Sequence, residues 1–591
     1  MKPIRIALIC NVGFEPFWYP LGISMLKENL ERCTNVHVDN YYLSSEFSWY
    51  IERYHEHLTE INDEIGEDGN CYHEIYFSTK LFNHADPQTL IEKVILNECN
   101  GKDIYRTRLG ETRNAQKISR SEKNFVMGVM EYCKLLDSFI TRKVEETNWY
   151  KYQLIGFSCL TSQVLCSAYM TKKIRQVGCR SLIVYGGGMF REWNVVQYKR
   201  LFPFIDRFVV GDGYHAILDF IRKKTSRLKA YSTTTQNHYG DFSDVPRKVS
   251  NSDRFIFPTQ LSDCCPWKKC LFCSIQSGLS RKASAKNVYE WIINASNKYG
   301  ASDFGFTDSN LNGSINEFGK LCSALSRTDV ELNFCGMLNP CDLTKRLCID
   351  LKSAGFSHVL LGFENFSNSM LSKMKKRNTV LDNITALKWL VEAGIKNIVF
   401  NIIIDFPGTS KSIIEENLTN ITMIKHLITR NVRCDLVEFD LERDSKIFKL
   451  KRKMNLLGLS NYEFDKICYP DKIQKDLKFH ALKYKWFSLV KGWEAVESIL
   501  KDKRQVRLDL VRRKGRFLIQ DYRIEKTTHC LTEEEYIIYK YICENASTID
   551  GISMETRKSK KQVKSMLKRL LSLGVVYEEK QKYLGLAFVK D

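Results

Sequence analysis

Short apolar runs alternate with polar, helix-like segments in the first part of this chain. The apolar runs occupy residues 4–10, 154–159, 182–185 and 207–210. Runs of this length with few polar interruptions are typical of parallel strands that are buried on both faces. They predict an α/β domain over residues 1–225. The long polar stretch between the first two runs, about 45–150, is predicted to be a helical insertion.

A second series of strands and helices begins near residue 250. Strands are predicted at 255–261, 303–307, 331–337, 358–363 and 397–404, and helices at 288–298, 315–326, 344–354 and 381–393. Gly300, Gly355 and Gly394 follow three of these helices, where glycine is the favoured left-handed cap. Repeated βα units of this length predict a parallel barrel or part of one over 250–450, with its chemistry at the carboxyl ends of the strands.

The end of the chain, 515–591, follows a different order. A strand is predicted at 517–519, helices at 533–543 and 560–571, and a hairpin at the end. Helix followed by hairpin predicts a small winged-helix-like α+β domain, and a packing or dimerisation module is an equal alternative. Residues 451–514 are predicted to be a helical connector.

Composition and charge narrow the class of protein. Hydrophobic residues make up 44% and charged residues 27%, which is ordinary for a soluble globular chain. The net charge of +20 is spread along the chain, and its denser runs, such as Arg222-Lys223-Lys224, are short. We interpret them as solvated surface, with nucleic acid an unlikely partner. No run reaches the roughly eighteen apolar residues of a membrane span and no signal peptide is visible, so we expect a cytoplasmic protein with no membrane partner.

Three cysteines form the most specific chemical pattern. Cys265, Cys270 and Cys273 have the spacing C-x4-C-x2-C, and Cys264 directly precedes them. Twenty scattered cysteines argue against a disulfide framework, and a single C-x2-C pair without a nearby histidine argues against a zinc finger. Thiolates are the ligands of iron–sulfur clusters. Three of them predict a four-iron cluster with one open iron.

Small and hydroxyl-bearing residues stand at the ends of consecutive predicted strands in the first domain. Carboxyl ends of parallel strands are where open α/β sheets bind ligands, and glycine permits close approach. The pattern predicts a nucleotide-like ligand. The residues are Ser158, Thr161, Ser162, Gly186, Gly187, Gly188, Gly211 and Gly213.

Together these segments resemble the cobalamin-binding radical S-adenosylmethionine (SAM) enzymes. The nearest resemblance is to the group associated with maturation of ribosomally made, post-translationally modified peptides. The segments that carry it, besides the cysteine loop and the strand ends above, are Phe306-Thr307-Asp308, Gly362-Phe363-Glu364-Asn365, Asn401 to Gly408, and the tail from Asp521-Tyr522-Arg523 to Ala587. The resemblance implies a Rossmann-like cobalamin domain followed by a radical SAM partial barrel.

The resemblance also implies cofactors and the residues that hold them. The cofactors would be a [4Fe-4S] cluster, SAM and cobalamin. Cys265, Cys270 and Cys273 would bind the cluster, with Cys265 favoured over Cys264 as the first ligand. The residues expected to contact SAM are Phe272, Asp308, Glu364 and Asn401, and those expected to contact cobalamin are Ser158, Thr161, Ser162, Gly186, Gly187 and Gly188. The D-x-H-x-x-G loop of other cobalamin proteins is absent, so cobalamin would bind without that histidine.

The implied function is C-methylation of an unactivated carbon in a peptide or small-molecule natural product, with an external electron donor. A radical rearrangement or cross-link without methyl transfer is one alternative. A cluster-containing, redox-sensing nucleic-acid-binding protein is another. No catalytic acid or base is identified. Cys335, Cys341 and Cys348 have a C-x5-C-x6-C spacing that favours buried thiols over an auxiliary cluster.

Overall fold

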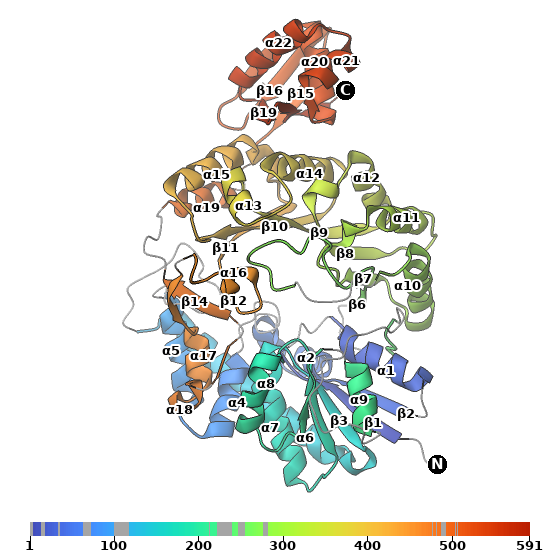
Figure 1. Ribbon diagram of the computed structural model, residues 1–591, viewed down its shortest axis with the longest axis vertical. Coiled ribbons are helices and arrows are strands. Elements are labelled where there is room, and N and C mark those ends of the chain that lie inside the picture. Colours follow the sequence, from blue (N-terminus) through green and yellow to red (C-terminus); the bar gives the residue numbers. More distant parts are fainter. Residues whose placement is uncertain are drawn as a thin grey trace.

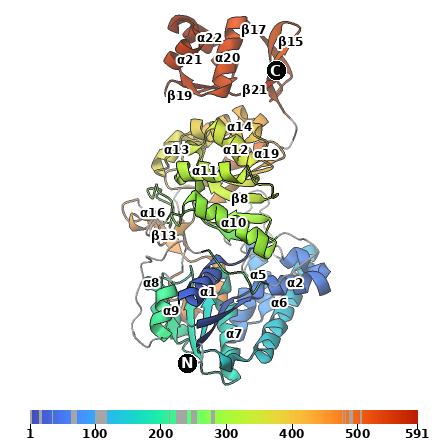
Figure 2. The same cartoon turned by 90° about the vertical axis from the view of Figure 1, so that its right-hand side faces the viewer.

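The computed structural model describes most of the chain and leaves several segments out. The described residues are 4–13, 18–33, 36–62, 72–99, 117–211, 213–221, 239–245, 255–275, 282–454, 456–475, 477–479, 481–485, 492–502, 504 and 506–590. The first domain lies at one end of the long axis, the second sheet with its helices lies in the middle, and the terminal domain lies at the other end (Figure 1, Figure 2). The basic run that begins at Arg222 lies outside the described residues.

Five parallel strands form the first sheet, in the order β2-β1-β3-β4-β5. They are β1 (Ile4–Cys10), β2 (Val36–Tyr42), β3 (Leu154–Ser158), β4 (Leu182–Gly186) and β5 (Arg207–Phe208). The pattern of apolar runs missed β2, an edge strand that carries His37, Asp39 and Asn40. The chain passes from β1 to β2 on one side of β1 and later enters β3 on its other side. The topological switch point therefore lies between β1 and β3, where the loops after these two strands separate.

Helices cover both faces of this sheet because alternate residues of β1 point to opposite sides. Ile6 and Leu8 pack with α1 (Leu21–Cys33) and α9 (Gly213–Ile221). Ala7 and Ile9 lie in a separate core on the other face. That core includes residues of α7 (Val164–Gln176), α8 (Glu192–Leu201) and the insertion helices α2 (Leu43–Tyr54), α4 (Tyr72–Phe82), α5 (Pro87–Cys99) and α6 (Arg120–Glu146).

The second sheet has six parallel strands in the order β11-β10-β9-β8-β7-β6. They are β6 (Ile256–Thr259), β7 (Asp303–Phe306), β8 (Asn333–Leu338), β9 (Phe356–Glu364), β10 (Asn397–Ile404) and β11 (Val432–Glu438). The helices between them are α10 (Ala285–Tyr299), α11 (Ile315–Leu325), α12 (Lys345–Ser353), α13 (Asn368–Lys373), α14 (Val380–Glu392) and α15 (Lys411–Met423). Neighbours in the sheet are neighbours in sequence, which is the order of a partial (βα) barrel.

The segment predicted to be a helical connector contains strands as well. A small sheet, β12-β14-β13, joins β12 (Leu441–Glu442), β13 (Leu457–Ser460) and β14 (Ala481–Lys485). Its helices are α16 (Lys446–Lys449), α17 (Glu463–Cys468), α18 (Asp471–Gln474) and α19 (Trp493–Lys501). These strands are short, and their pairing depends on segments distant in the sequence. The apolar and polar positions within such short segments are therefore too few to predict a strand.

The terminal domain combines two small sheets with three helices. Its elements are β15 (Leu508–Arg513), β16 (Arg516–Asp521), β17 (Thr527–Leu531), α20 (Glu533–Glu544), β18 (Ser547–Thr548), α21 (Ile549–Thr556), α22 (Lys560–Ser572), β19 (Val576–Glu579), β20 (Lys582–Gly585) and β21 (Phe588–Lys590). The first strand begins at 508, slightly before the predicted boundary at 515. The predicted closing hairpin is β19-β20. A winged-helix identity for this domain stays a prediction.

Buried hydrogen bonds to backbone carbonyls join the terminal domain to the barrel. The Lys388 ammonium of α14 donates to the Cys543 carbonyl, and Arg523 donates to the Met423 carbonyl at 2.7 Å. His426 Nε2 lies 2.8 Å from the Leu586 carbonyl oxygen, and burial lowers the pKa of this histidine to about 3. The two domains therefore share one continuous core.

Among the described residues, none of the helices combines the length and the apolar character that crossing a membrane requires.

Candidate functional site

The cysteine loop directly follows β6 and is held from two sides. On one side, the Leu271 amide donates to the Met374 carbonyl at 2.9 Å, and Trp267 Nε1 donates to the Lys375 carbonyl at 2.8 Å. On the other, the Ile447 amide of α16 donates to the Leu271 carbonyl at 2.9 Å. The loop is thus fixed to the turn after α13 and to the connector.

Cys264 and the three cysteines after it differ in burial. Cys264 is 4% exposed, while Cys265, Cys270 and Cys273 are half-buried. Burial, with smaller contributions from the neighbouring Cys273 and Cys265, raises the pKa of Cys270 to about 11, although the nearby Lys376 lowers it. These three thiols therefore lie near one another at an accessible surface.

The donor set of the cysteine loop consists of thiols, which are the ligands that iron–sulfur clusters take. In the described part of the chain, no three His, Cys, Asp or Glu side chains are gathered closely enough to hold one metal ion. A four-iron cluster is wider than one ion and takes soft thiolates at its corners. Asn310 Nδ2 lies 3.8 Å from Cys265 Sγ, as an amide that hydrogen-bonds a cluster-ligand sulfur would. The three half-buried thiols match those requirements.

Asp308, predicted to contact SAM, has its carboxylate engaged by the backbone. It accepts hydrogen bonds from the amides of Leu261 at 2.9 Å and Ser262 at 2.5 Å, and from the Ser262 hydroxyl at 3.0 Å. Burial raises the pKa of this carboxyl to about 6. These bonds fix the start of the cysteine loop, and a contact of Asp308 with SAM stays a prediction.

Glu364 forms a buried ion pair that the sequence did not reveal. Lys376 Nζ lies 3.1 Å from Glu364 Oε1 with only 8% of the lysine side chain exposed. Burial opposes the charge of Lys376, but Glu364 first and then Cys270 raise the pKa of this lysine above its ordinary value, so the cation lies within electrostatic reach of the cysteine loop. A Cβ at Gly362 would lie 3.2 Å from Lys376 Nζ, so glycine leaves room for the pair. No sequence spacing links Lys376 to Glu364, because the turn after α13 brings them together.

Asn401 lies on the same face of the sheet as Glu364. Half-buried residues alternate with buried ones along β9 and β10, which places Gly362, Glu364, Asn401 and Ile403 on the interior face. The register of β9 and β10 shifts between Phe400 and Ile402, where the step from Leu361 to Glu364 carries the extra residue, so the bulge lies in β9 opposite Asn401. Bulges re-aim side chains beside active sites. The contacts of Asn401 with SAM stay a prediction.

Two acidic residues at neighbouring strand ends have left-handed backbones. Glu364, which ends β9, has φ +65°, and Asp405, which follows β10, has φ +56°. Such conformations cost of order 1–3 kcal/mol and cluster at functional sites. Phe272 packs beside this edge against the cluster that contains Met374 and Phe406. The barrel's carboxyl-end edge is therefore the strained part of the second domain.

In the first domain, three strand ends align at one level. Ser158 of β3 lies opposite Cys10 of β1 on one side and Gly186 of β4 on the other. Beyond β3, the Thr161 hydroxyl lies 3.5 Å from the Met189 sulfur, and the Ser162 hydroxyl donates to the Gly13 carbonyl at 2.5 Å. The predicted hydroxyl residues thus lie at the carboxyl edge of the sheet.

Gly187 is required by a close approach of two backbone segments. Its φ is +105°, and a Cβ there would lie 2.6 Å from the Cys159 carbonyl oxygen. Gly188 is less crowded, since a Cβ there would lie 3.4 Å from the Leu160 side chain. The glycine turn therefore packs directly on the loop that follows β3.

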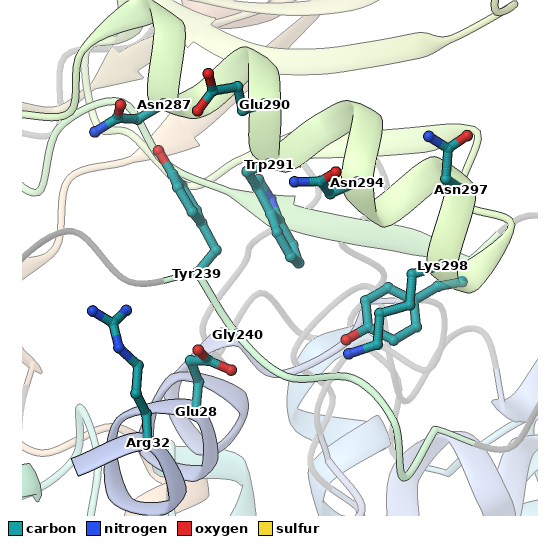
Figure 3. A pocket seen from close by; sticks show the side chains of 11 residues that line it. Glu28, Arg32, Tyr239, Gly240, Asn287, Glu290, Trp291, Asn294, Asn297 and Lys298 are labelled. Carbon is teal, nitrogen blue, oxygen red and sulfur yellow. The ribbon is translucent and has the colours of Figure 1, made fainter.

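A cavity of about 700 Å³ lies apart from these residues, between α1 and α10. Tyr239 stacks on Trp291 with ring centroids 5.2 Å apart, and Glu28 and Arg32 of α1 face them across the cavity (Figure 3). None of the predicted site residues lines it. Of the three cysteines predicted to be buried thiols, Cys348 is buried, whereas Cys335 and Cys341 are half-buried. Cys341 Sγ donates to Asn339 Oδ1 at 2.9 Å.

Comparison with known proteins agrees with this geometry. Residues 259–420 match the model of the radical SAM superfamily. No curated protein matches the chain. Of the solved structures, the radical SAM methyltransferase TsrM from Kitasatospora setae with cobalamin and a [4Fe-4S] cluster bound is 12% identical, at a TM-score of 0.54, over 97% of this chain and 100% of that one. The same enzyme with tryptophan substrate and a SAM analogue bound is 14% identical, at a TM-score of 0.53, over 84% of this chain and 88% of that one.

Residues 259–420 of the second domain are thus similar to the radical SAM superfamily, and the chain as a whole has the fold of the solved TsrM structures. The predicted α/β fold is confirmed, since the chain shares the TsrM architecture along almost its whole length. The predicted cluster and SAM agree with the domain.

Proposed function

We propose that this protein is a cobalamin-dependent radical SAM enzyme that methylates an unactivated carbon of a peptide or small-molecule natural product. The proposal rests on two features that occur together in this chain. A cysteine loop lies beside Lys376 and Glu364 in a radical SAM domain, and a doubly wound sheet with glycine and hydroxyl residues at its carboxyl edge precedes it. TsrM, solved with cobalamin and cluster, shares that architecture.

Each part of the site has an assigned task in this proposal. Cys265, Cys270 and Cys273 hold the cluster. When bound, the cluster would supply the electron that cleaves SAM, and the corrinoid would supply the methyl group. Glu364 accepts from the amino group of SAM, and the neighbouring Lys376 attracts its carboxylate, because a zwitterion is matched by an adjacent anion and cation. Asp308 keeps the cysteine loop in place.

The corrinoid rests on the carboxyl edge of the first sheet in this proposal. Ser158, Thr161 and Ser162 supply hydroxyl groups, and Gly186, Gly187 and Gly188 let the backbone approach the ring. An electron donor delivers the reducing equivalent, and the cytoplasm is the proposed location. A peptide substrate would add a strand to β17, which ends its sheet. The hairpin strand β19 suits this less, because the Glu579 carboxylate at its end accepts from the Leu381 amide of α14.

Anaerobic purification and reconstitution test the proposal. We expect about four irons per chain, matching sulfide, and bound corrinoid. A chemical reductant should then release methionine and 5′-deoxyadenosine from SAM, and Cys270→Ala should lose both the iron and the cleavage. SAM cleavage by Cys270→Ala would contradict the proposed cluster. Failure of the wild-type protein to retain corrinoid would contradict the proposed role of cobalamin. Product without an added methyl group would favour rearrangement or cross-linking, and salt-sensitive DNA binding would favour the sensor alternative.

A further inference from the structure

The helical insertion reaches the carboxyl edge of the first sheet with one helix. Helix α4 begins at Tyr72, and its first turn carries His73 and Glu74. Both side chains are buried, with 0% of His73 and 2% of Glu74 exposed. Ionisable side chains with so little exposure are rare in proteins unless they have defined partners. Here the partners lie in the loop after β3 and in the helix that follows it.

His73 binds the loop after β3 at the switch point. Its Nε2 lies 2.7 Å from the Ser162 carbonyl oxygen, so this nitrogen carries the proton and donates. Burial lowers the pKa of His73 to about 4, which keeps the ring neutral. Its Nδ1 has no hydrogen-bond partner in the described structure. A Cβ at Gly13 would lie 2.1 Å from the Ser162 oxygen and 2.7 Å from His73 Nε2, so the three residues meet in a space that only glycine fits.

Glu74 binds the start of α7, the helix that directly follows the loop. Its two carboxylate oxygens accept from the amides of Leu165 at 2.7 Å and Cys166 at 2.8 Å, in the first turn of α7. Gln163 completes the arrangement, because its Nε2 donates to the Asn11 carbonyl at 2.6 Å. The end of the loop and the start of α7 are therefore held by α4, and Gln163 between them ties the loop to the residue after β1.

We propose that His73 and Glu74 are positioning residues for the corrinoid, which keep the loop 159–163 in its binding shape. The inference rests on the proposed function, since it concerns the same edge that carries Thr161 and Ser162. It gives the insertion a task that its sequence did not show. Neither side chain needs to touch the ring, because each acts through a backbone group of the loop or helix.

The helix provides a matched control. Ser78 is equally buried in α4 and also donates to a backbone carbonyl, but that carbonyl belongs to Cys468 of the connector. Ser78→Ala therefore removes a hydrogen bond of the same kind from the same helix without touching the loop. His73→Gln retains an amide donor, whereas His73→Leu has none.

Binding of hydroxocobalamin to the full-length protein tests the proposal. We would measure its dissociation constant and the absorption spectrum of the bound form, with iron content as the check of folding. His73→Leu and Glu74→Gln should bind on the order of tenfold more weakly and shift the spectrum, because each leaves buried backbone groups unpaired. His73→Gln should recover most of the affinity, and Ser78→Ala should bind like the wild type.

The outcomes separate this inference from the proposed function. If the wild-type protein binds no hydroxocobalamin, the cobalamin part of the proposed function fails and this inference fails with it. If the wild type binds and His73→Leu and Glu74→Gln bind equally well, only the positioning role is wrong. Equal weakening in Ser78→Ala would also overturn it, since the effect would then come from the stability of α4. If His73→Leu loses its iron, that variant has not folded. The dissociation constants of Glu74→Gln and His73→Gln are then compared with that of Ser78→Ala to test the positioning role.

Discussion

Asp444 accepts a hydrogen bond from Arg191 Nε at 3.0 Å and joins the two halves of the site. Trp193 Nε1 donates to the other oxygen of the same carboxylate, also at 3.0 Å. Arg191 lies just beyond the glycine turn of the first domain, and Asp444 lies three residues before Ile447, which bonds the cysteine loop. The two loops that we propose for different cofactors are thus connected through one short segment.

Removing the Asp444 carboxylate should loosen this connection. We expect Asp444→Ala to lower the free energy of unfolding by about 1–2 kcal/mol, since hydrogen bonds to a charged group are lost at a partly exposed site. Urea unfolding of the full chain measures it. Asp435→Ala is the control, because its ion pair with Arg433 is largely exposed and should contribute little. Equal effects of both substitutions would contradict the prediction.

The identity of the first cluster ligand is open to a direct comparison. Cys264→Ala should retain iron and sulfide after reconstitution, because Cys264 is buried whereas Cys265, Cys270 and Cys273 are half-buried. Cys265→Ala should lose most of both, because a thiolate ligand is removed. Iron and sulfide analysis measures the difference. Retention by Cys265→Ala together with loss by Cys264→Ala would reverse the assignment.

The buried pair of Lys376 and Glu364 predicts a non-additive mutant series. Lys376→Met leaves a buried carboxylate without its cation, which should destabilise the fold by about 3–5 kcal/mol. The double variant Lys376→Met with Glu364→Gln should recover most of that loss, because both charges are gone.

Binding of SAM should not recover in the double variant. We expect its affinity for SAM to be weaker than the wild type by more than tenfold, since charged hydrogen bonds contribute about 1.5–3 kcal/mol each. Isothermal titration with reconstituted protein measures the affinity, and iron content shows that the cluster is present. Wild-type affinity in the double variant would remove both residues from the SAM site.

Gly187 should tolerate no side chain. Gly187→Ala combines a left-handed backbone with a contact of 2.6 Å to a carbonyl oxygen, so we expect reduced corrinoid retention and a destabilised first domain. Gly300→Ala is the matched control, because it has φ +71° and nothing within 4 Å of the added Cβ. Cobalamin titration and thermal unfolding compare them. A larger effect at Gly300 would be inconsistent with the close approach seen at Cys159.

Docking of the terminal domain should depend on pH through His426. Its pKa in the folded state is about 3, below the ordinary value of 6.5, because burial opposes the charged form. The stability that it contributes is therefore present above pH 6.5 and is lost as the pH falls toward 3. His426→Gln, which retains a donor for the Leu586 carbonyl, should show a shallower loss of unfolding free energy below pH 6.5. Urea unfolding at several pH values measures the loss, and the same pH dependence in His426→Gln and the wild type would contradict the prediction.

Local patterns located most of the elements that carry the site. The apolar runs predicted β1 and β10 with their observed bounds, because strands covered on both faces have a continuous apolar signal. The same reasoning failed for β2 and β14, which are an edge strand and a short strand in a small sheet. Their pairing depends on partners distant in sequence. For the same reason, the prediction of a helical connector over 451–514 missed the strands β13 and β14 that lie among its helices.

The amino-acid sequence by itself determined the cysteine triplet, the strand-end motifs and the order of the domains. Those features are local, since each depends on residues within one loop or one βα unit. Only the tertiary structure decided that Lys376 pairs with Glu364, that Asp308 holds the cysteine loop, and that His73 and Glu74 reach the first sheet. These contacts join side chains to distant segments, and their strength comes from burial, which no spacing along the chain encodes.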